Sequence, residues 1–239
     1  MGVTVKEKLD IVISENQHDV VKTHLSVKDF DGTRKFVVKK PVRVNGGKFF
    51  LFGKRFFDIV CSLVAILFFL IPSVVIAVCI VTTSKGPAIY SQKRLGKNAT
   101  EFNIYKFRTM VIDAEKDGAV WAKKDDDRVT KIGALLRKTH LDEIPQFWNI
   151  LKGDMSVVGP RPERQFFYDE FESYIVGFKH RLYVKPGLTG WAQINGGYEL
   201  KPEEKVAWDV EYIEKQSFLI DLKCVLKTYK LLLGDDQAR

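Results

Sequence analysis

Two adjacent carboxylates, Asp142 and Glu143, stand in a polar segment between the cations Arg137 and Lys138 and the helix-limiting Pro145. Adjacent side chains of a helix do not share a face, so one carboxylate can meet a substrate while the other meets a metal. An ionised carboxylate is a nucleophile that needs no general base, and Mg²⁺ binds through one or two carboxylates together with substrate phosphates. The segment therefore indicates either a nucleophile beside a metal site or, as the alternative, an ordinary solvated helix end.

Two further segments place cations where a phosphate could be bound. Arg161 is on a stiff loop between Pro160 and Pro162, and its guanidinium fork suits bidentate contact with phosphate oxygens. Lys106 and Arg108 are on an expected strand, which is a more rigid placement than a loop. The alternatives are a surface arginine in a turn and strand-edge charges that discourage sheet pairing.

The elements that must position these residues begin with an apolar run over residues 59–84, 26 residues without a charge, with Pro72 near its middle. Basic residues flank both ends of the run: Lys54, Arg55, Lys85, Lys93, Arg94 and Lys97. Lys and Arg stay mostly on the cytoplasmic side of a membrane, and an arm of about a dozen residues makes about 18 Å of helix against about 30 Å of hydrocarbon. We therefore expect a re-entrant segment that turns at Pro72, with a bitopic, proline-kinked helix as the alternative.

The residues after the apolar run predict a mostly helical α+β fold. Short strands are expected over residues 88–90 and 102–107 around a tight turn. Helical spacing begins near Ile112 and again near Thr130, where Asp127 could cap the second helix.

The remaining pattern alternates loops with amphipathic segments. Residues 153–163 and 185–190 are expected to form a loop and a turn, and residues 164–176 and 202–212 to form helices. The apolar, lysine-rich segment 218–233 is expected either to be an interfacial helix on a membrane surface or to be an ordinary packing helix.

The composition suits a basic protein with a real core. The 239 residues are 46% hydrophobic, and the net charge is +8 with a pI of about 9.2. This charge suits nucleic acid, anionic lipid or phosphorylated substrates, and the apolar run favours the last two. Because zinc-finger, RNP and homeodomain patterns are absent, no nucleic-acid partner is expected. The spacing of the three cysteines, Cys61, Cys79 and Cys224, is not that of metal ligands.

No cleavage site accompanies the apolar run, so we expect the apolar run to stay in the mature protein.

Six short segments follow the apolar run in a fixed order. They are SQKRLG (91–96), YKFRTM (105–110), LDEIPQ (141–146), LKGDMS (151–156), GPRPE (159–163) and KPGLTGW (185–191). In this order the chain resembles the bacterial sugar transferase family, the monotopic polyprenol-phosphate sugar-1-phosphate transferases, over about residues 54–233. It resembles the small form of the family, in which no bundle of spanning helices precedes the re-entrant segment.

The resemblance implies a phosphoglycosyl transferase that moves a sugar-1-phosphate from a UDP-sugar to undecaprenyl phosphate and releases UMP. Such a reaction begins the lipid-linked assembly of capsule, exopolysaccharide, O-antigen or glycan. The resemblance further implies that Asp142 attacks the β-phosphorus and forms a phosphosugar–enzyme intermediate, and that Glu143 helps to hold Mg²⁺. Lys106 and Arg161 would bind phosphate oxygens. The sugar of the donor is either a hexose or an N-acetylated hexosamine, and the resemblance does not decide between them.

The resemblance divides the chain into three parts: an N-terminal extension of unknown role (1–48), a re-entrant membrane anchor (49–84) and a cytoplasmic catalytic domain (85–239). The extension could be a small strand pair or largely disordered. The enzyme is expected to be monotopic in the bacterial cell membrane, with its catalytic domain on the cytoplasmic face, and a homo-oligomer is compatible with this. Many members of the family carry Arg where this chain has Gly197, and Ser before the kink proline where it has Ile71.

The alternative function is a non-enzymatic membrane-anchored scaffold or regulator of a polysaccharide export complex. A scaffold keeps the basic, membrane-facing surface but gives the polar residues no shared site. Lys106, Asp142, Glu143 and Arg161 would then lie scattered over the fold.

Overall fold

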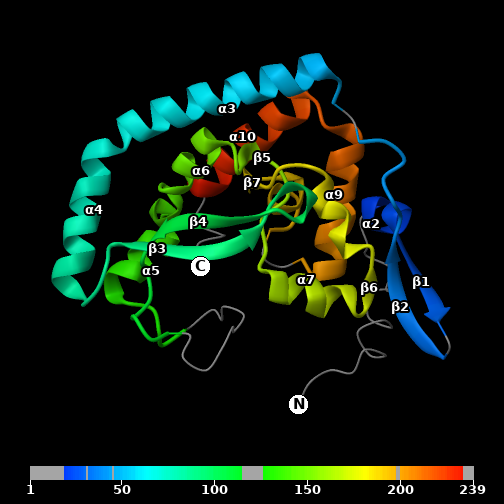
Figure 1. Cartoon of the computed structure of the whole chain (residues 1–239), viewed down its shortest axis with the longest axis horizontal. Coiled ribbons are helices and arrows are strands. Elements are labelled where there is room, and N and C mark those ends of the chain that lie inside the picture. The colour runs from blue at the N-terminus through cyan, green and yellow to red at the C-terminus, as the bar shows by residue number, and fades with distance from the viewer. Residues whose placement is uncertain (1–18, 31, 45, 115–125, 198–199, 234–239) are drawn as a thin grey trace.

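The computed structural model describes residues 19–30, 32–44, 46–114, 126–197 and 200–233, and Figure 1 gives their arrangement. The α-helices are α2 (Asp19–His24), α3 (Lys48–Phe68), α4 (Leu70–Thr83), α5 (Lys131–Lys138), α6 (Gln146–Lys152), α7 (Gln165–Glu172), α8 (Trp191–Ile194), α9 (Pro202–Lys215) and α10 (Phe218–Leu233). The 3-10 helices are η1 (Lys97–Ala99), η2 (Leu141–Glu143) and η3 (Phe178–Tyr183). The strands are β1 (Leu25–Phe30), β2 (Thr33–Val38), β3 (Ile89–Leu95), β4 (Glu101–Phe107), β5 (Ser156–Val158), β6 (Ile175–Val176) and β7 (Gly187–Thr189). The fold is mixed and mostly helical, as the sequence predicts.

The apolar run forms the bent pair α3 and α4, which wraps along one side and one end of the molecule (Figure 1). Within the described residues no single helix is long and apolar enough for a membrane span, but the two together are, and they meet at 60°. The bend is at Phe69, so the prediction of a break at Pro72 itself is wrong by three residues. Pro72 lies in the first turn of α4 and has no N–H for the carbonyl of Phe68, so the helix is interrupted one turn before the proline.

Polar contacts fix the first half of α3 to the globular part of the protein. Lys54 Nζ lies 2.5 Å from Asp221 Oδ2 of α10. Arg55 donates to two backbone carbonyls at the end of α6, each at 2.7 Å. Buried Asp58 accepts from Ser156 Oγ at 3.0 Å and from the next backbone N–H at 2.9 Å. The helix of 21 residues is therefore longer than the expected arm of about a dozen because its first half is a packing element.

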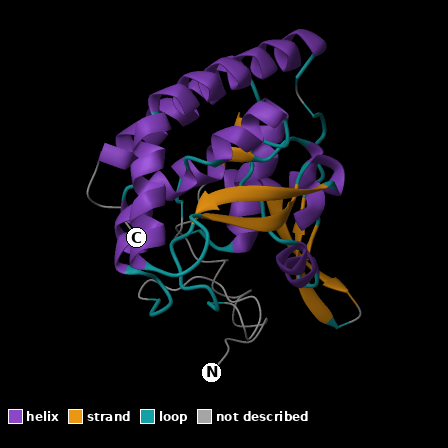
Figure 2. Ribbon diagram, turned by 60° about the vertical axis from the view of Figure 1, so that its left-hand side comes forward, coloured by secondary structure: helices purple, strands orange, loops and turns teal. Residues whose placement is uncertain are grey.

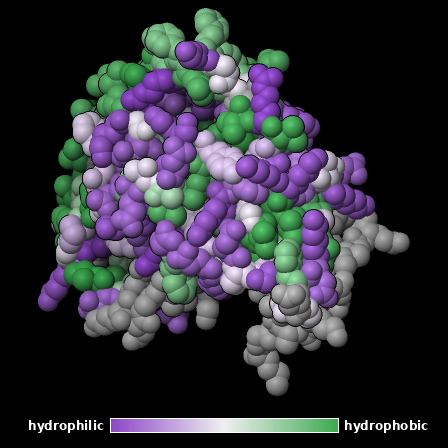
Figure 3. Space-filling view, turned by 45° about the vertical axis from the view of Figure 1, so that its right-hand side comes forward, coloured by the Kyte–Doolittle hydropathy of each residue, from purple (hydrophilic) through white to green (hydrophobic). Residues whose placement is uncertain are grey.

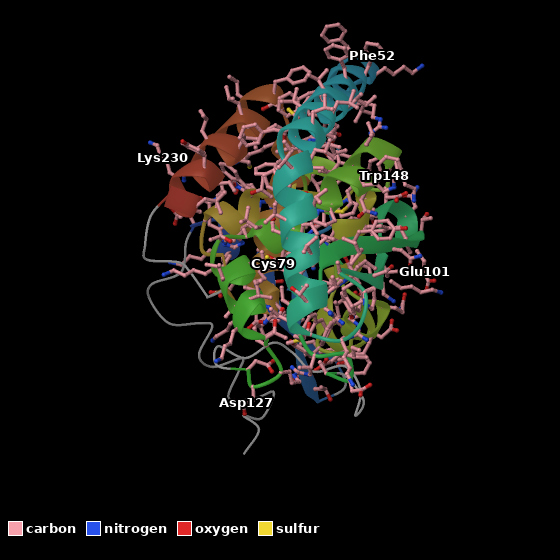
Figure 4. The ribbon with its side chains drawn as sticks, turned by 90° about the vertical axis from the view of Figure 1, so that its left-hand side faces the viewer. Phe52, Cys79, Glu101, Asp127, Trp148 and Lys230 are labelled. Carbon is pink, nitrogen blue, oxygen red and sulfur yellow. The ribbon has the colours of Figure 1, made fainter. Side chains whose placement is uncertain are left out.

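The end of α4 is held in a similar way by β4 and its continuation. The buried guanidinium of Arg108 donates to the carbonyls of Ser84 and Lys85 and to Ser84 Oγ, and thereby satisfies backbone groups at the helix C-terminus. Between these two attachments the apolar side chains of the bent pair are exposed: Val64, Leu67, Phe68, Leu70, Ile71, Val74, Val75 and Val78. Figure 4 views the molecule from the α4 side, where Cys79 marks this helix and Phe52 the start of α3.

The residues before α3 include a strand pair, which is one of the two alternatives predicted for the extension. β1 and β2 form an antiparallel hairpin, and β2 pairs in parallel with β6. Phe36 and Val38 pack with Val206 and Val210 of α9 in one core cluster. Figure 2 displays this hairpin at the end of the molecule opposite α4. Residues 1–18 lie outside the described residues.

The two strand segments predicted after the apolar run are confirmed. β3 and β4 pair antiparallel, with Ile89 opposite Phe107 and Leu95 opposite Glu101. The predicted loop at 153–163 and the predicted turn at 185–190 are less irregular than expected, because β5 and β7 within them pair in parallel. Parallel pairing joins segments distant in sequence, which local pattern does not reveal.

Several helix boundaries differ from the sequence prediction. The cap of α5 is Thr130, whose Oγ1 accepts from the N–H of Gly133 at 3.0 Å, and not Asp127. Residues 111–114 are not helical, and residues 115–125 lie outside the described part of the chain. α7 ends at Glu172 because the chain turns to form β6.

α10 has two faces with different surroundings. Asp221 and Cys224 are buried against the core, whereas Leu219, Leu226 and Tyr229 are among the apolar residues exposed on the other side. The helix therefore packs and also presents apolar surface, and its contact with a membrane stays a prediction. The face in Figure 3, turned away from α4, is largely hydrophilic with smaller apolar patches.

Candidate active site

The acid pair lies on a single turn between two helices. α5 ends at Lys138, and His140 adopts a left-handed φ of 56°, which redirects the chain into η2. Pro145, with its fixed φ, is the N-cap residue directly before α6. This turn places the Asp142 side chain inward, where the residue is only 7% exposed.

Lys106 reaches both carboxylates from β4. Its Nζ lies 2.6 Å from Glu143 Oε1 and 3.7 Å from Asp142 Oδ2. The cation is held on a strand that is paired along its length with β3, so its position is set by backbone hydrogen bonds as well as by the carboxylates.

Arg161 approaches Glu143 from the loop after β5. Its Nη2 lies 2.7 Å from the same Oε1 that Lys106 contacts. Glu143 thus bridges two cations from different elements, and the three residues form one charged cluster beside Asp142.

The two neighbouring carboxylates differ in acidity. Burial raises the pKa of Asp142 above its usual range, although Lys106 acts in the opposite sense. Burial also acts to raise the pKa of Glu143, but Arg161 and Lys106 outweigh it and hold that pKa well below its usual range. Neighbouring acids with such different environments are suited to different roles.

The loop that carries Arg161 is fixed by polar contacts that the sequence did not predict. Arg181 of η3 donates from Nη2 to the Arg161 carbonyl at 3.0 Å, and its Nε lies 2.6 Å from Asp209 Oδ2 of α9. On the other side, Arg94 of β3 lies 3.1 Å from Glu163. Sequence spacing gave no signal for these pairs, since each joins elements far apart in the chain.

The donor set fits Mg²⁺ held partly by a substrate. Lys106 and Arg161 both contact Oε1 of Glu143, so this carboxylate lies where phosphate oxygens bound by the two cations would meet it. Within the described ranges no group of three or more His, Cys, Asp and Glu side chains could hold a metal alone. One or two carboxylates completed by phosphate oxygens is a ligand set that Mg²⁺ accepts.

The four residues predicted to bind or transform phosphate therefore lie together, whereas Pro72 lies apart from them in α4. The scaffold alternative expected them to be scattered. Their catalytic roles stay predictions. Gly197, at the position where an Arg is common in the family, has a φ of 56°, a conformation that favours glycine.

Comparison with known proteins gives a consistent match. The family model described as bacterial sugar transferase matches residues 49–235. The chain is 41% identical over 193 residues to the UDP-N-acetylgalactosamine-undecaprenyl-phosphate N-acetylgalactosaminephosphotransferase of Aeromonas hydrophila, which covers 80% of this chain and 46% of that protein. It is 42% identical over 180 residues to the UDP-glucose:undecaprenyl-phosphate glucose-1-phosphate transferase of Klebsiella pneumoniae, covering 73% and 39%.

A third relative carries another sugar in its name. The undecaprenyl-phosphate galactose phosphotransferase of Salmonella typhimurium is 39% identical over 202 residues, covering 78% of this chain and 42% of that protein. The chain thus spans less than half the length of each of these three relatives.

Proposed function

Because the chain belongs to the bacterial sugar transferase family, we propose that it transfers a sugar-1-phosphate from a UDP-sugar to undecaprenyl phosphate and releases UMP. The observation that carries this proposal is the cluster in which Lys106 and Arg161 converge on Glu143 beside the buried Asp142. Two cations and two carboxylates in one place suit a reaction in which negative charge is brought together and redistributed.

The first step forms a covalent intermediate. An oxygen of the Asp142 carboxylate bonds to the β-phosphorus of the donor, and the bond from that phosphorus to the oxygen bridging the α-phosphate breaks. The electron pair leaves with UMP, and the sugar phosphate stays on Asp142 as an acyl phosphate. Burial of Asp142 favours this attack, because a carboxylate with little solvation is a stronger nucleophile.

The second step transfers the sugar phosphate to lipid. An oxygen of undecaprenyl phosphate bonds to the same phosphorus, and the bond to Asp142 breaks and regenerates the carboxylate. Two steps allow a water-soluble donor and a membrane-bound acceptor to use one site in turn. The product is a diphosphate-linked lipid sugar that begins the assembly of a polysaccharide or glycan.

The remaining residues bind and orient the phosphates. Lys106 and Arg161 exchange part of their contact with Glu143 for oxygens of the donor diphosphate, and the guanidinium can make two parallel hydrogen bonds. Glu143 would hold Mg²⁺, which when bound neutralises charge on the phosphate oxygens. The Arg161 backbone stays fixed meanwhile by Arg181.

The bent pair provides the anchor in the membrane. Its apolar side chains are exposed between two polar attachments to the globular part, and basic residues flank both ends. A pair that bends by 60° can enter and leave the same leaflet. The protein is then monotopic in the bacterial cell membrane, with the acid pair near the headgroups on the cytoplasmic face.

The sugar is a choice among close alternatives. The names of the three relatives contain N-acetylgalactosamine, glucose and galactose, and the family match alone does not select one. We propose that the donor is a UDP-hexose or a UDP-N-acetylhexosamine.

The test is a panel of UDP-sugars incubated with the purified chain, Mg²⁺ and undecaprenyl phosphate, with UMP measured for each. One donor should release UMP, and Asp142→Asn should abolish the release while it leaves the fold and membrane association intact. Asp169→Asn on α7, an exposed carboxylate, is the matched control and should retain activity. Absence of UMP with every donor, or normal turnover by Asp142→Asn, would contradict the proposal.

A further inference from the structure

One edge of β4 is completed by a side chain in place of a strand. Among the described strands β4 pairs with β3 alone, and its other edge faces α6. There the amide of Asn149 accepts from the backbone N–H of Tyr105 at 3.0 Å and donates to the carbonyl of Asn103 at 2.7 Å. One donor and one acceptor in this arrangement reproduce what a peptide of a neighbouring strand would offer.

The surroundings of Asn149 make these two hydrogen bonds difficult to replace. The residue is fully buried, with an exposed fraction of 0%. Its own backbone carbonyl accepts from the N–H groups of Gly153 and Asp154 at 3.1 and 3.0 Å, which fixes the last turn of α6. Removal of this buried amide would leave the N–H of Tyr105 and the carbonyl of Asn103 without the partner that they have on α6.

Of the two elements that Asn149 joins, β4 carries a cation of the candidate site and α6 follows the acid pair closely in the chain. α6 follows the acid pair after two residues, and Lys106 directly follows Tyr105 on β4. The 2.6 Å contact between Lys106 and Glu143 therefore depends on how closely β4 packs against α6. Asn149 joins α6 to the backbone of β4 through two hydrogen bonds, one on each side of Ile104.

We propose that Asn149 is a positioning residue: it holds β4 against α6 so that Lys106 is placed over the acid pair and ready for the donor diphosphate. This inference rests on the proposed function, because the position of Lys106 matters for activity only if Lys106 binds the donor diphosphate. Asn149 does not touch the substrate and acts through Lys106.

A double-mutant cycle separates this role from a general contribution to folding. UDP is the probe, and its affinity for the chain of residues 1–239 in detergent with Mg²⁺ is measured by calorimetry. Asn149→Ala should weaken UDP binding roughly tenfold. A loss of this size is typical of the coupling energy between two substitutions in one network of contacts. In a Lys106→Ala background the same change should weaken binding by less than about twofold, because the group it positions is already gone.

Ser156→Ala is the matched control for loss of a buried polar contact. Its hydroxyl is fully buried and donates to Asp58, but it makes no bond to β4 among the described contacts. It should lower stability and leave UDP affinity unchanged. If Asn149→Ala does not fold, Asn149→Asp takes its place in the cycle, since it keeps the acceptor for Tyr105 and loses the donor to Asn103.

The outcomes are distinct. If the wild-type chain binds UDP and Asn149→Ala lowers the affinity equally with Lys106 present and with Lys106→Ala, the positioning role is overturned. The proposed function would still stand. Unchanged affinity in Asn149→Ala would have the same two consequences. Failure of the wild-type chain to bind UDP would contradict the proposed function itself and, with it, the purpose assigned to Lys106.

Discussion

Replacement of Arg181 by Met should lower both stability and activity, for separable reasons. Its Nε lies 2.6 Å from Asp209 Oδ2, and the two side chains are only 3% and 2% exposed. The guanidinium also packs over Phe178, 4.9 Å from the ring centroid, and donates to the carbonyl of Arg161. Arg181→Met therefore leaves a buried, unpaired carboxylate, and we expect the free energy of unfolding to fall by about 3–5 kcal/mol.

The double variant Arg181→Met with Asp209→Leu distinguishes the two effects. It removes the unpaired charge, so most of the lost stability should return, since an apolar replacement of a buried ion pair is often neutral. Activity should remain reduced, because the carbonyl of Arg161 still lacks its donor and the loop is free to shift. Denaturant unfolding in one detergent gives the stability, and UMP release gives the activity.

The control is the exposed pair of Lys179 and Asp169, whose side chains are 48% and 56% exposed at 3.3 Å. Lys179→Met should leave unfolding and activity unchanged, because solvent screens such a pair. A loss of stability below about 1 kcal/mol in Arg181→Met, or full activity in the double variant, would refute the reasoning.

Three further predictions concern the anchor and pH. Single cysteines at positions 52 and 93, in a chain without its native cysteines, should both react with a label only from the cytoplasmic side; labelling from opposite sides would mean a spanning helix. Pro72→Ala supplies the N–H that the carbonyl of Phe68 lacks, so it should bring the two helices closer to one line, but position 93 should stay on the cytoplasmic side because β3 remains paired with β4; labelling of position 93 from the other side would contradict this. Burial lowers the pKa of His24 below its usual value, so the unfolded chain binds more protons and stability should fall as pH drops below about 6.5. His24→Gln should flatten that fall in urea unfolding between pH 7 and 5; an unchanged slope would contradict it.

The residues that meet in the candidate site could be predicted from residue types and their order. Asp142, Glu143, Lys106 and Arg161 were each ambiguous alone, since an acid pair at a helix end and a basic residue on a loop or strand are common. The fixed order of six short segments selected one interpretation among them. The resulting cluster lies together in the structure, although its catalytic roles stay predictions.

The residues that hold the site could not be predicted in this way. Arg181 and Asp209 are 28 residues apart, and Asn149 meets Tyr105 across 44 residues. Such polar contacts follow from the tertiary arrangement and have no local periodicity. Each resembles an ordinary surface residue when the sequence is read alone.

The predicted boundaries of two helices were wrong for a different reason. The break of the apolar run lies at Phe69 because a proline acts on the carbonyl four residues before it, so its effect appears one turn upstream. Thr130 and Asp127 are both good capping residues, and the choice between them depended on where the first turn of α5 packs.

The most direct test of the proposed mechanism is to trap the chain with its donor in the absence of lipid. The UDP-sugar selected by the panel, radiolabelled in the β-phosphate, is mixed with the protein, and the digest is analysed by mass spectrometry. We predict a sugar phosphate on the peptide that contains Asp142, lost on addition of undecaprenyl phosphate and absent in Asp142→Asn. Product formation without any adduct on that peptide would contradict the covalent mechanism.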